Sequence, residues 1–148
     1  MKFEETRNIT TVPNVCEPII FCLLDNGEVV YVGQSKNGLR SAYQDTTRIF
    51  DSISFFACKE DELDKIQADM ILKYQPKYNR TLPGKSYFSF RKTRELVRQE
   101  TRFKTFSLFD LKKMIKEIGL TVYAFDGVNY IKAESFEKIL CFLNEDTQ

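Results

Sequence analysis

The sequence predicts a mixed domain of the α/β (α+β) class, with helices flanking a small, mainly antiparallel sheet of three strands. Three strand-like runs, a tight turn and a helical pattern support this prediction. The first two runs are IIFCLL (19–24) and EVVYVG (28–33), and Asn26-Gly27 between them is a strong β-hairpin signal. The aromatic-rich run SISFFAC (52–58) supplies the third strand.

Two helices are expected beside this sheet. GLRSAYQ (38–44) is short and follows the second strand, and we expect it to be helical. A longer helix is predicted over residues 61–74, because apolar residues recur there at helical spacing and Pro76 stops the pattern. The apolar positions are Leu63, Ile66, Met70, Ile71 and Tyr74.

The last third of the chain predicts a small helix-hairpin-helix appendage. An amphipathic helix is expected over 107–120, where Ser107 and Asp110 form a capping-box pattern. A hairpin over 121–131 follows, with an Asp-Gly turn, and a closing helix is expected over 133–143. We therefore expect an N-terminal arm, a first domain, a basic connecting segment and a C-terminal module. Their ranges are 1–17, 18–84, 85–104 and 105–148.

Composition excludes several classes of protein. The 148 residues carry a net charge of only +1, so the charge of the whole chain does not indicate a nucleic-acid partner. The four cysteines form no CxxC pair and there is no histidine, which argues against a Cys/His zinc site. No apolar run is long enough to span a bilayer and no apolar leader begins the sequence, so we expect a cytoplasmic protein without a membrane partner.

Four short pieces of the first half carry a more specific signal. They are IIF (19–21), YVG (31–33) followed by QSKN, Arg40 nine residues after the tyrosine of YVG, and MILKYQPKYN (70–79). In this order and spacing they resemble the GIY-YIG nuclease domain. The resemblance covers about residues 19–79, close to half of the chain, and implies a GIY-YIG-like fold for the first domain.

The resemblance implies phosphodiester hydrolysis and a role for each matched residue. Tyr31 would contact or deprotonate the attacking water, and Arg40 would support the charged phosphate with its planar fork. Gly33 would let the backbone approach the site closely. Asn79 would fix the backbone of the site or the substrate. The family also uses a helix glutamate to hold one Mg²⁺.

Two positions depart from the family pattern. The metal-binding glutamate would lie nine residues before Pro76, where this chain has Gln67, and the tyrosine of the first motif falls on Phe21. Gln67 lacks the charged oxygen that Mg²⁺ prefers, so the implied cofactor is doubtful. Asp64, one turn earlier, is a possible substitute, although its side chain is short for the task. A deliberate Glu-to-Gln inactivation would leave the same residue.

A nucleic-acid partner is expected from the resemblance and from the basic segment. Residues 85–104 carry seven basic and two acidic side chains, interleaved with aromatic rings that can stack on bases. DNA is the first expectation and RNA the alternative, while an ordinary solvated helix would account for the charges equally simply. The candidate substrate-binding residues are Gly33, Gln34, Lys36, Lys85, Arg91, Arg94 and Arg98.

Three functions remain open from the sequence. The first is a nucleic-acid-binding protein with an impaired cleavage site, and the second is an active Mg²⁺-dependent endonuclease with a variant metal ligand. The third is a protein inhibitor or interaction module that reuses the scaffold. The C-terminal module weakly resembles the winged helical modules of excisionase-type DNA-binding proteins, and a helical appendage that covers the sheet or dimerises is the alternative.

Overall fold

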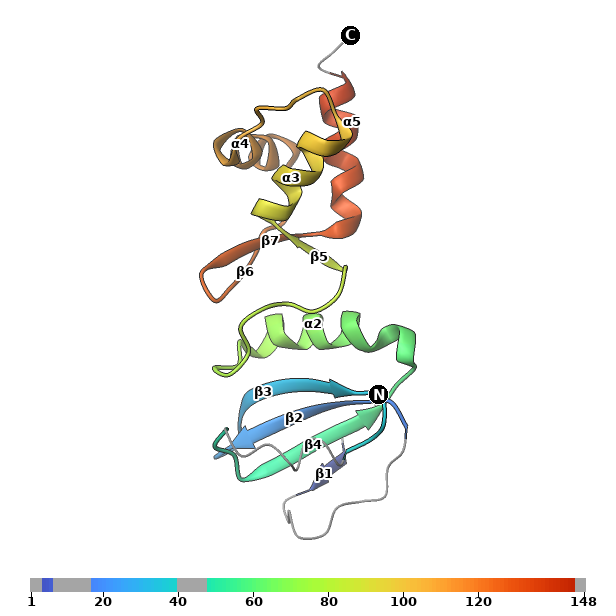
Figure 1. Ribbon diagram of the computed structural model, residues 1–148. Helices are drawn as coiled ribbons and strands as arrows, with labels where there is room; N and C mark the ends of the chain where they lie inside the picture. Colours follow the sequence, from blue (N-terminus) through green and yellow to red (C-terminus); the bar gives the residue numbers. More distant parts are fainter. Residues whose placement is uncertain (1–3, 7–16, 40–47, 146–148) are drawn as a thin grey trace. The chain divides into compact units, whose positions relative to one another are not determined.

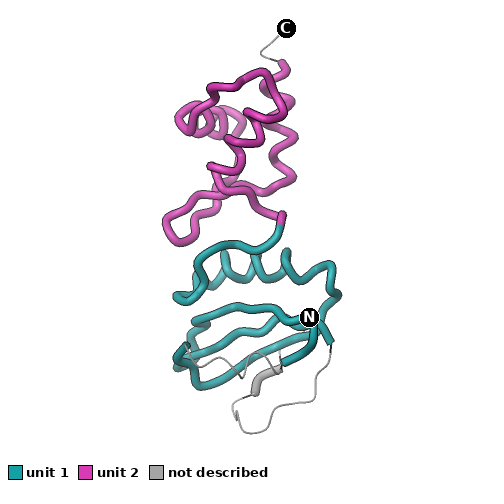
Figure 2. Tube along the Cα trace, viewed as in Figure 1, with its two compact units in different colours: residues 1–84 teal, residues 85–148 magenta. Residues whose placement is uncertain are grey.

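The computed structural model describes residues 4–6, 17–39 and 48–145 (Figure 1). The chain divides into two compact units, residues 1–84 and 85–148 (Figure 2). By this division residues 85–104 fall within the second unit. The helix expected over 38–44 lies mostly outside the described residues. None of the helices within the described ranges is long and apolar enough to cross a membrane.

The first unit is built on an antiparallel sheet of four strands (Figure 1). These are β1 (Glu4–Thr6), β2 (Ile19–Asp25), β3 (Glu28–Ser35) and β4 (Ser52–Ala57), in the order β1-β4-β2-β3. The expected three strands and the mixed fold class are confirmed. The fourth strand comes from the segment that the sequence indicated as an arm, because β1 pairs with β4.

The predicted hairpin of β2 and β3 is confirmed. Asn26 and Gly27 at its turn have φ of 52° and 80°, the left-handed conformation that a two-residue type I′ turn requires. One register shift separates Leu23 from Leu24, and the pairing then continues to Ile19 and Ser35. Because β3 is the last strand in the sheet order, one edge of its backbone is left for partners outside the sheet.

The sheet buries an apolar face and is accompanied by one long helix among the described residues. Ile19, Leu23 and Ile53 are fully buried in the cluster on one face. Helix α2 (Leu63–Tyr74) follows a short 3₁₀ turn and contacts β3 and β2. It ends at Gln75, whose φ of 49° is left-handed, immediately before Pro76. The predicted helix over 61–74 is thus confirmed.

The second unit contains three helices and a small sheet in the order β5-β7-β6. Its strands are β5 (Tyr87–Ser89), β6 (Tyr123–Phe125) and β7 (Val128–Lys132), and its helices are α3 (Phe90–Glu100), α4 (Leu108–Ile118) and α5 (Phe136–Glu145). The three helices pack around a common core in which Val97, Leu111, Ile131 and Ile139 are fully buried. The predicted helix-hairpin-helix is present, and β5 and α3 of the basic segment complete its core.

Local signals account for the ends of these elements. The Ser107 side chain accepts from the Asp110 N–H, and Asp110 in turn accepts from the Ser107 N–H, so the expected capping box is present. The hydrogen bond from the Ser107 backbone lowers the pKa of Asp110. Asp126 and Gly127 have φ of 48° and 76° at the turn of the β6–β7 hairpin, as in the first hairpin.

Candidate functional site

The backbone edge of β3 that no strand pairs with is held by the segment after α2. Asn79 is 7% exposed and forms a pair of hydrogen bonds with the backbone of Val32. Its Oδ1 accepts from the Val32 N–H at 2.9 Å, and its Nδ2 donates to the Val32 carbonyl oxygen, also at 2.9 Å. The Tyr78 N–H also donates to the Val30 carbonyl. Asn79 therefore gives Val32 the hydrogen-bond partners that a neighbouring strand would otherwise supply.

Gln67 of α2 forms a hydrogen bond with the same carbonyl oxygen of Val32. Its Nε2 donates to the Val32 oxygen at 3.0 Å, and its Oε1 accepts from Gln34 Nε2 at 2.6 Å. The residue is buried, at 8% exposure. Both ends of the Gln67 amide thus have partners, and the structure brings Gln67 and Asn79 together at Val32, the residue after Tyr31.

Gln34 links this buried pair to an open recess. Its Nε2 donates its second hydrogen to Asp64 Oδ1, again at 2.6 Å. The recess has a volume of about 620 Å³ and is lined by acidic residues of the 3₁₀ turn and α2 as well as by Gln34 and Lys36. Lys36 forms an ion pair with Glu60 at 3.3 Å. The candidate substrate residues Gln34 and Lys36 therefore lie beside carboxylates, which offset their attraction for phosphate.

Asp64 is fixed in place on two sides. In addition to the bond from Gln34, the loop after α2 returns over it, and a Cβ on Gly84 would lie 2.5 Å from the Cβ of Asp64. Gly84 also has a φ of 74°, which favours glycine. Asp64 is thus linked to Gln67 through Gln34, and Gly84 packs closely against its side chain.

Position 33 needs a glycine because the ring of Phe21 packs directly against it. Phe21 and Gly33 are cross-strand partners, and Phe21 is 7% exposed. A Cβ on Gly33 would lie 2.8 Å from Phe21 Cε1 and closer still to Cζ. The ring of Phe21 therefore occupies the space that glycine leaves open, and this packing gives Gly33 a structural role besides any role in binding.

Tyr31 has a cationic partner that the sequence did not indicate. The Arg48 guanidinium lies over the Tyr31 ring, 3.7 Å from its centre, and Phe21 packs near the same ring at 6.1 Å. Arg48 belongs to no recognisable motif, and only the folded chain places it there. Arg40, the candidate catalytic arginine, lies outside the described residues.

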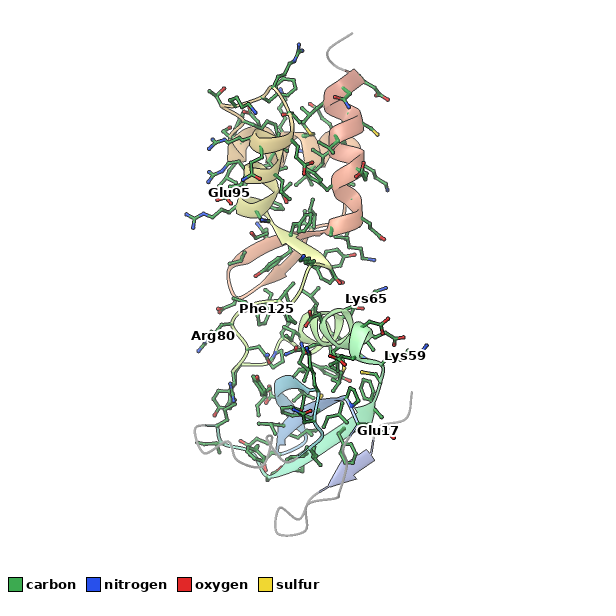
Figure 3. All side chains as sticks on the ribbon, turned by 45° about the vertical axis from the view of Figure 1, so that its right-hand side comes forward. Glu17, Lys59, Lys65, Arg80, Glu95 and Phe125 are labelled. Atoms are coloured by element: carbon green, nitrogen blue, oxygen red, sulfur yellow. The ribbon has the colours of Figure 1, made fainter. Side chains whose placement is uncertain are left out.

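The basic residues of α3 fall into two groups. Arg91 and Lys92 are exposed, as is Lys85 before β5. Arg98 donates from Nε to the Phe106 carbonyl at 2.8 Å, and Arg94 Nε is buried without a hydrogen-bond partner among the described residues. Figure 3 shows Glu95 of α3 projecting away from α5. Arg94 and Arg98 thus contribute to packing, whereas the first group is accessible, as are Arg102 and Lys104 after α3.

The residues around Gln67 do not fit a magnesium ion. Mg²⁺ prefers charged oxygen ligands in octahedral geometry, whereas the Gln67 oxygen is neutral and already accepts a hydrogen bond. Within the described ranges, no group of three His, Cys, Asp or Glu residues is placed to hold a metal ion. We therefore derive no catalytic step through a metal at this site.

No protein-family model and no curated protein matches this chain. It is similar to crystal structures of the GIY-YIG N-terminal endonuclease domain of UvrC from Thermotoga maritima. The form bound to magnesium, its catalytic divalent cation, is 28% identical, and the match covers 49% of this chain and 91% of that chain with a TM-score of 0.41. A Tyr-to-Phe point mutant and an Asn-to-Ala point mutant, each bound to the catalytic cation, match at 28% and 26% identity with the same coverage and TM-score. At this TM-score the likeness assigns neither a family nor an activity to this chain.

Proposed function

We propose that this protein binds nucleic acid, DNA in the first place, through a GIY-YIG-type first unit whose phosphodiester-cleavage site is impaired. The observation that carries the proposal is the hydrogen bonding of Gln67. At the position where the sequence motif has a metal-binding carboxylate, a neutral amide is bonded on both sides, to Gln34 and to Val32. Gln67 is thereby part of a hydrogen-bonded brace and offers no charged ligand atom.

The binding part of the proposal is supported by the accessible cations. Lys85, Arg91 and Lys92 are exposed in the basic segment, and Lys36 is exposed beside the first unit's recess. Phosphate binding needs solvent-facing cations, and these three side chains of the basic segment are exposed. The guanidinium of Arg48 on Tyr31 adds a further cation beside the sequence motif.

Binding is tested by fluorescence anisotropy with a labelled duplex oligonucleotide at several salt concentrations. The variant is Lys85→Ala/Arg91→Ala/Lys92→Ala, called the α3 variant below. Each lost phosphate contact should lower the slope of log affinity against log salt by about 0.9, so the α3 variant should lose up to about 2.7 units of slope. Lys138→Ala, an exposed lysine of α5, is the matched control.

Arg94 and Arg98 are unsuitable targets for this test. Their replacement would remove the bond to Phe106 or disturb a buried guanidinium, so lost binding would reflect lost packing. Unaltered affinity in the α3 variant would contradict the assignment of this segment. Absence of any salt-dependent binding by the unmodified protein would favour the protein-interaction function.

Cleavage is tested by a plasmid-nicking time course with Mg²⁺ or Mn²⁺. We expect no more nicking by the unmodified protein than by Arg40→Ala. The Gln67→Glu variant should gain divalent-ion binding, measured as an ion-dependent rise in melting temperature, at a cost in stability because Glu cannot donate to the Val32 carbonyl.

A second function, an active endonuclease with a variant ligand, has one supporting observation. Asp64 shares the Gln34 amide with Gln67 and is therefore the carboxylate nearest to the brace along the hydrogen bonds. Strong metal-dependent nicking that Asp64→Asn and Arg40→Ala both abolish would establish this function and overturn the impaired-site proposal.

A further inference from the structure

Helix α4 presents a basic and aromatic face to solvent. The face consists of Phe109, Lys112, Lys113 and Lys116, called the α4 surface below. At 100° per residue these positions fall within an arc of roughly 100°, opposite the side that enters the core. The buried residues of the helix are Leu111, Met114 and Ile115. Phe109 is 76% exposed, more than any other large apolar side chain in the described part of the chain.

The charges of the α4 surface have one acidic neighbour on the helix, because the charge of Lys113 contributes to lowering the pKa of Asp110. None of its three lysines forms an ion pair with a described residue. Asp110, their neighbour on the helix, is engaged in the capping box with Ser107. Charge is also segregated along the second unit, because residues 85–119 carry ten basic and four acidic side chains, whereas residues 120–148 carry two and five. The surface is therefore complementary to an anionic partner.

A recess adjoins the same lysines. It has a volume of about 310 Å³ and lies between α4 and the strands that follow it. Lys112 and Lys116 line it on the helix side, Leu120 and Val122 give it apolar walls, and Asn129 of β7 contributes an amide. A concave apolar space with one amide and two cations suits a flat group with polar edges that is attached to a phosphate.

Single-stranded nucleic acid fits these features better than other anionic partners do. Lysines contact phosphates, and an exposed aromatic ring can stack on a base only where that base is not already stacked in a duplex. An acidic peptide would pair with the lysines but offers no regular flat partner for Phe109. An anionic membrane would accept the lysines and Phe109 but leave the recess without an occupant.

We propose that the α4 surface and its recess bind a single-stranded stretch of nucleic acid. The lysines contact successive phosphates, Phe109 stacks on one base, and the recess receives a neighbouring base. This inference rests on the proposed function for the class of partner, but it concerns residues that the α3 variant leaves intact.

The test uses the full chain and fluorescence anisotropy with a labelled 20-nucleotide single strand and its duplex. Phe109→Leu keeps an apolar side chain but removes the ring, and it should weaken single-strand binding about five-fold or more. Phe109→Trp should bind at least as tightly as the unmodified protein. Lys112→Ala/Lys116→Ala should lower the single-strand salt slope by about 1.4, and Lys138→Ala is again the control.

The outcomes separate this inference from the proposed function. Unchanged single-strand affinity in Phe109→Leu and in the double lysine variant, with duplex binding still lost in the α3 variant, would overturn the inference alone. Equal losses on single strand and duplex would overturn the single-strand assignment. Loss of binding to phosphatidylserine vesicles, with oligonucleotide binding unaffected, would assign the surface to a membrane. Absence of all oligonucleotide binding by the unmodified protein would overturn both proposals. Thermal melting should show no loss of fold, because every substituted side chain is exposed.

Discussion

Replacement of Asn79 by alanine should destabilise the first unit, because it removes two hydrogen bonds to the backbone of Val32. The side chain makes two buried hydrogen bonds, one to the Val32 N–H and one to the Val32 carbonyl. After the substitution the carbonyl keeps Gln67 Nε2 as a donor. The Val32 N–H keeps no partner from Asn79 and becomes a buried, unsatisfied donor on the edge strand.

The magnitude follows from these two bonds. Loss of an ordinary hydrogen bond costs about 1 kcal/mol, and a buried donor left without a partner costs about 1–3 kcal/mol. We therefore expect Asn79→Ala to lower the free energy of unfolding by about 2–4 kcal/mol. Gln67→Met, which removes the other donor to the Val32 carbonyl, should couple with it, so the double variant should lose more than the sum of the two single losses.

The measurement combines urea denaturation followed by circular dichroism with hydrogen exchange at the Val32 amide. Asn79→Ala should lower the urea midpoint and greatly accelerate exchange at Val32. Asn37→Ala, an exposed asparagine of the same unit, is the matched control and should change stability by less than about 0.5 kcal/mol. A loss below about 1 kcal/mol together with unchanged protection of Val32 would refute the reasoning.

Three further predictions concern packing, capping and pH. Gly33→Ala should cost about 1–3 kcal/mol because its new methyl group overlaps the Phe21 ring, and the same substitution should cost less in a Phe21→Ala background, as urea melts of the two pairs would show. Ser107→Ala should cost about 1 kcal/mol by removing the cap of α4, seen as a lower melting temperature of the second unit. Burial raises the pKa of Cys22 from 9.0 to about 12. Between these two pH values its thiol stays protonated in the folded protein, whereas the thiol of the unfolded chain ionises. Stability should therefore decline as pH rises from 9.0 toward about 12, and a thiol reagent at pH 8 should label exposed Cys141 but leave Cys22 unmodified until urea is added.

The sequence by itself determined the elements that depend on neighbouring residues. The Asn26-Gly27 turn defines a hairpin because its two residues accept left-handed φ values, and the apolar spacing from Leu63 to Tyr74 defines a helix with one buried side. The capping box of α4 is equally local, since its two partners are three residues apart. Each of these features follows from backbone preference and periodicity within a short window.

The sequence indicated less clearly that residues 85–104 pack with the rest of the second unit. The run of cations in 85–104 has the pattern of a solvated connector, yet Phe90 and Val97 enter the core and β5 pairs with β7. A strand of three residues is too short to show alternation. Its partner lies more than forty residues away, so no local pattern predicted the pairing.

The candidate site shows most clearly what only the tertiary structure decided. The sequence placed Gln67 and Asn79 at motif positions, but it did not indicate that both donate to the carbonyl of Val32, 35 and 47 residues away. It also did not indicate Arg48 over Tyr31 or the crowding of Asp64 by Gly84. These contacts arise because β3 is an edge strand whose free backbone groups must find partners, and sheet order, which no local pattern encodes, determines which side chains can reach them.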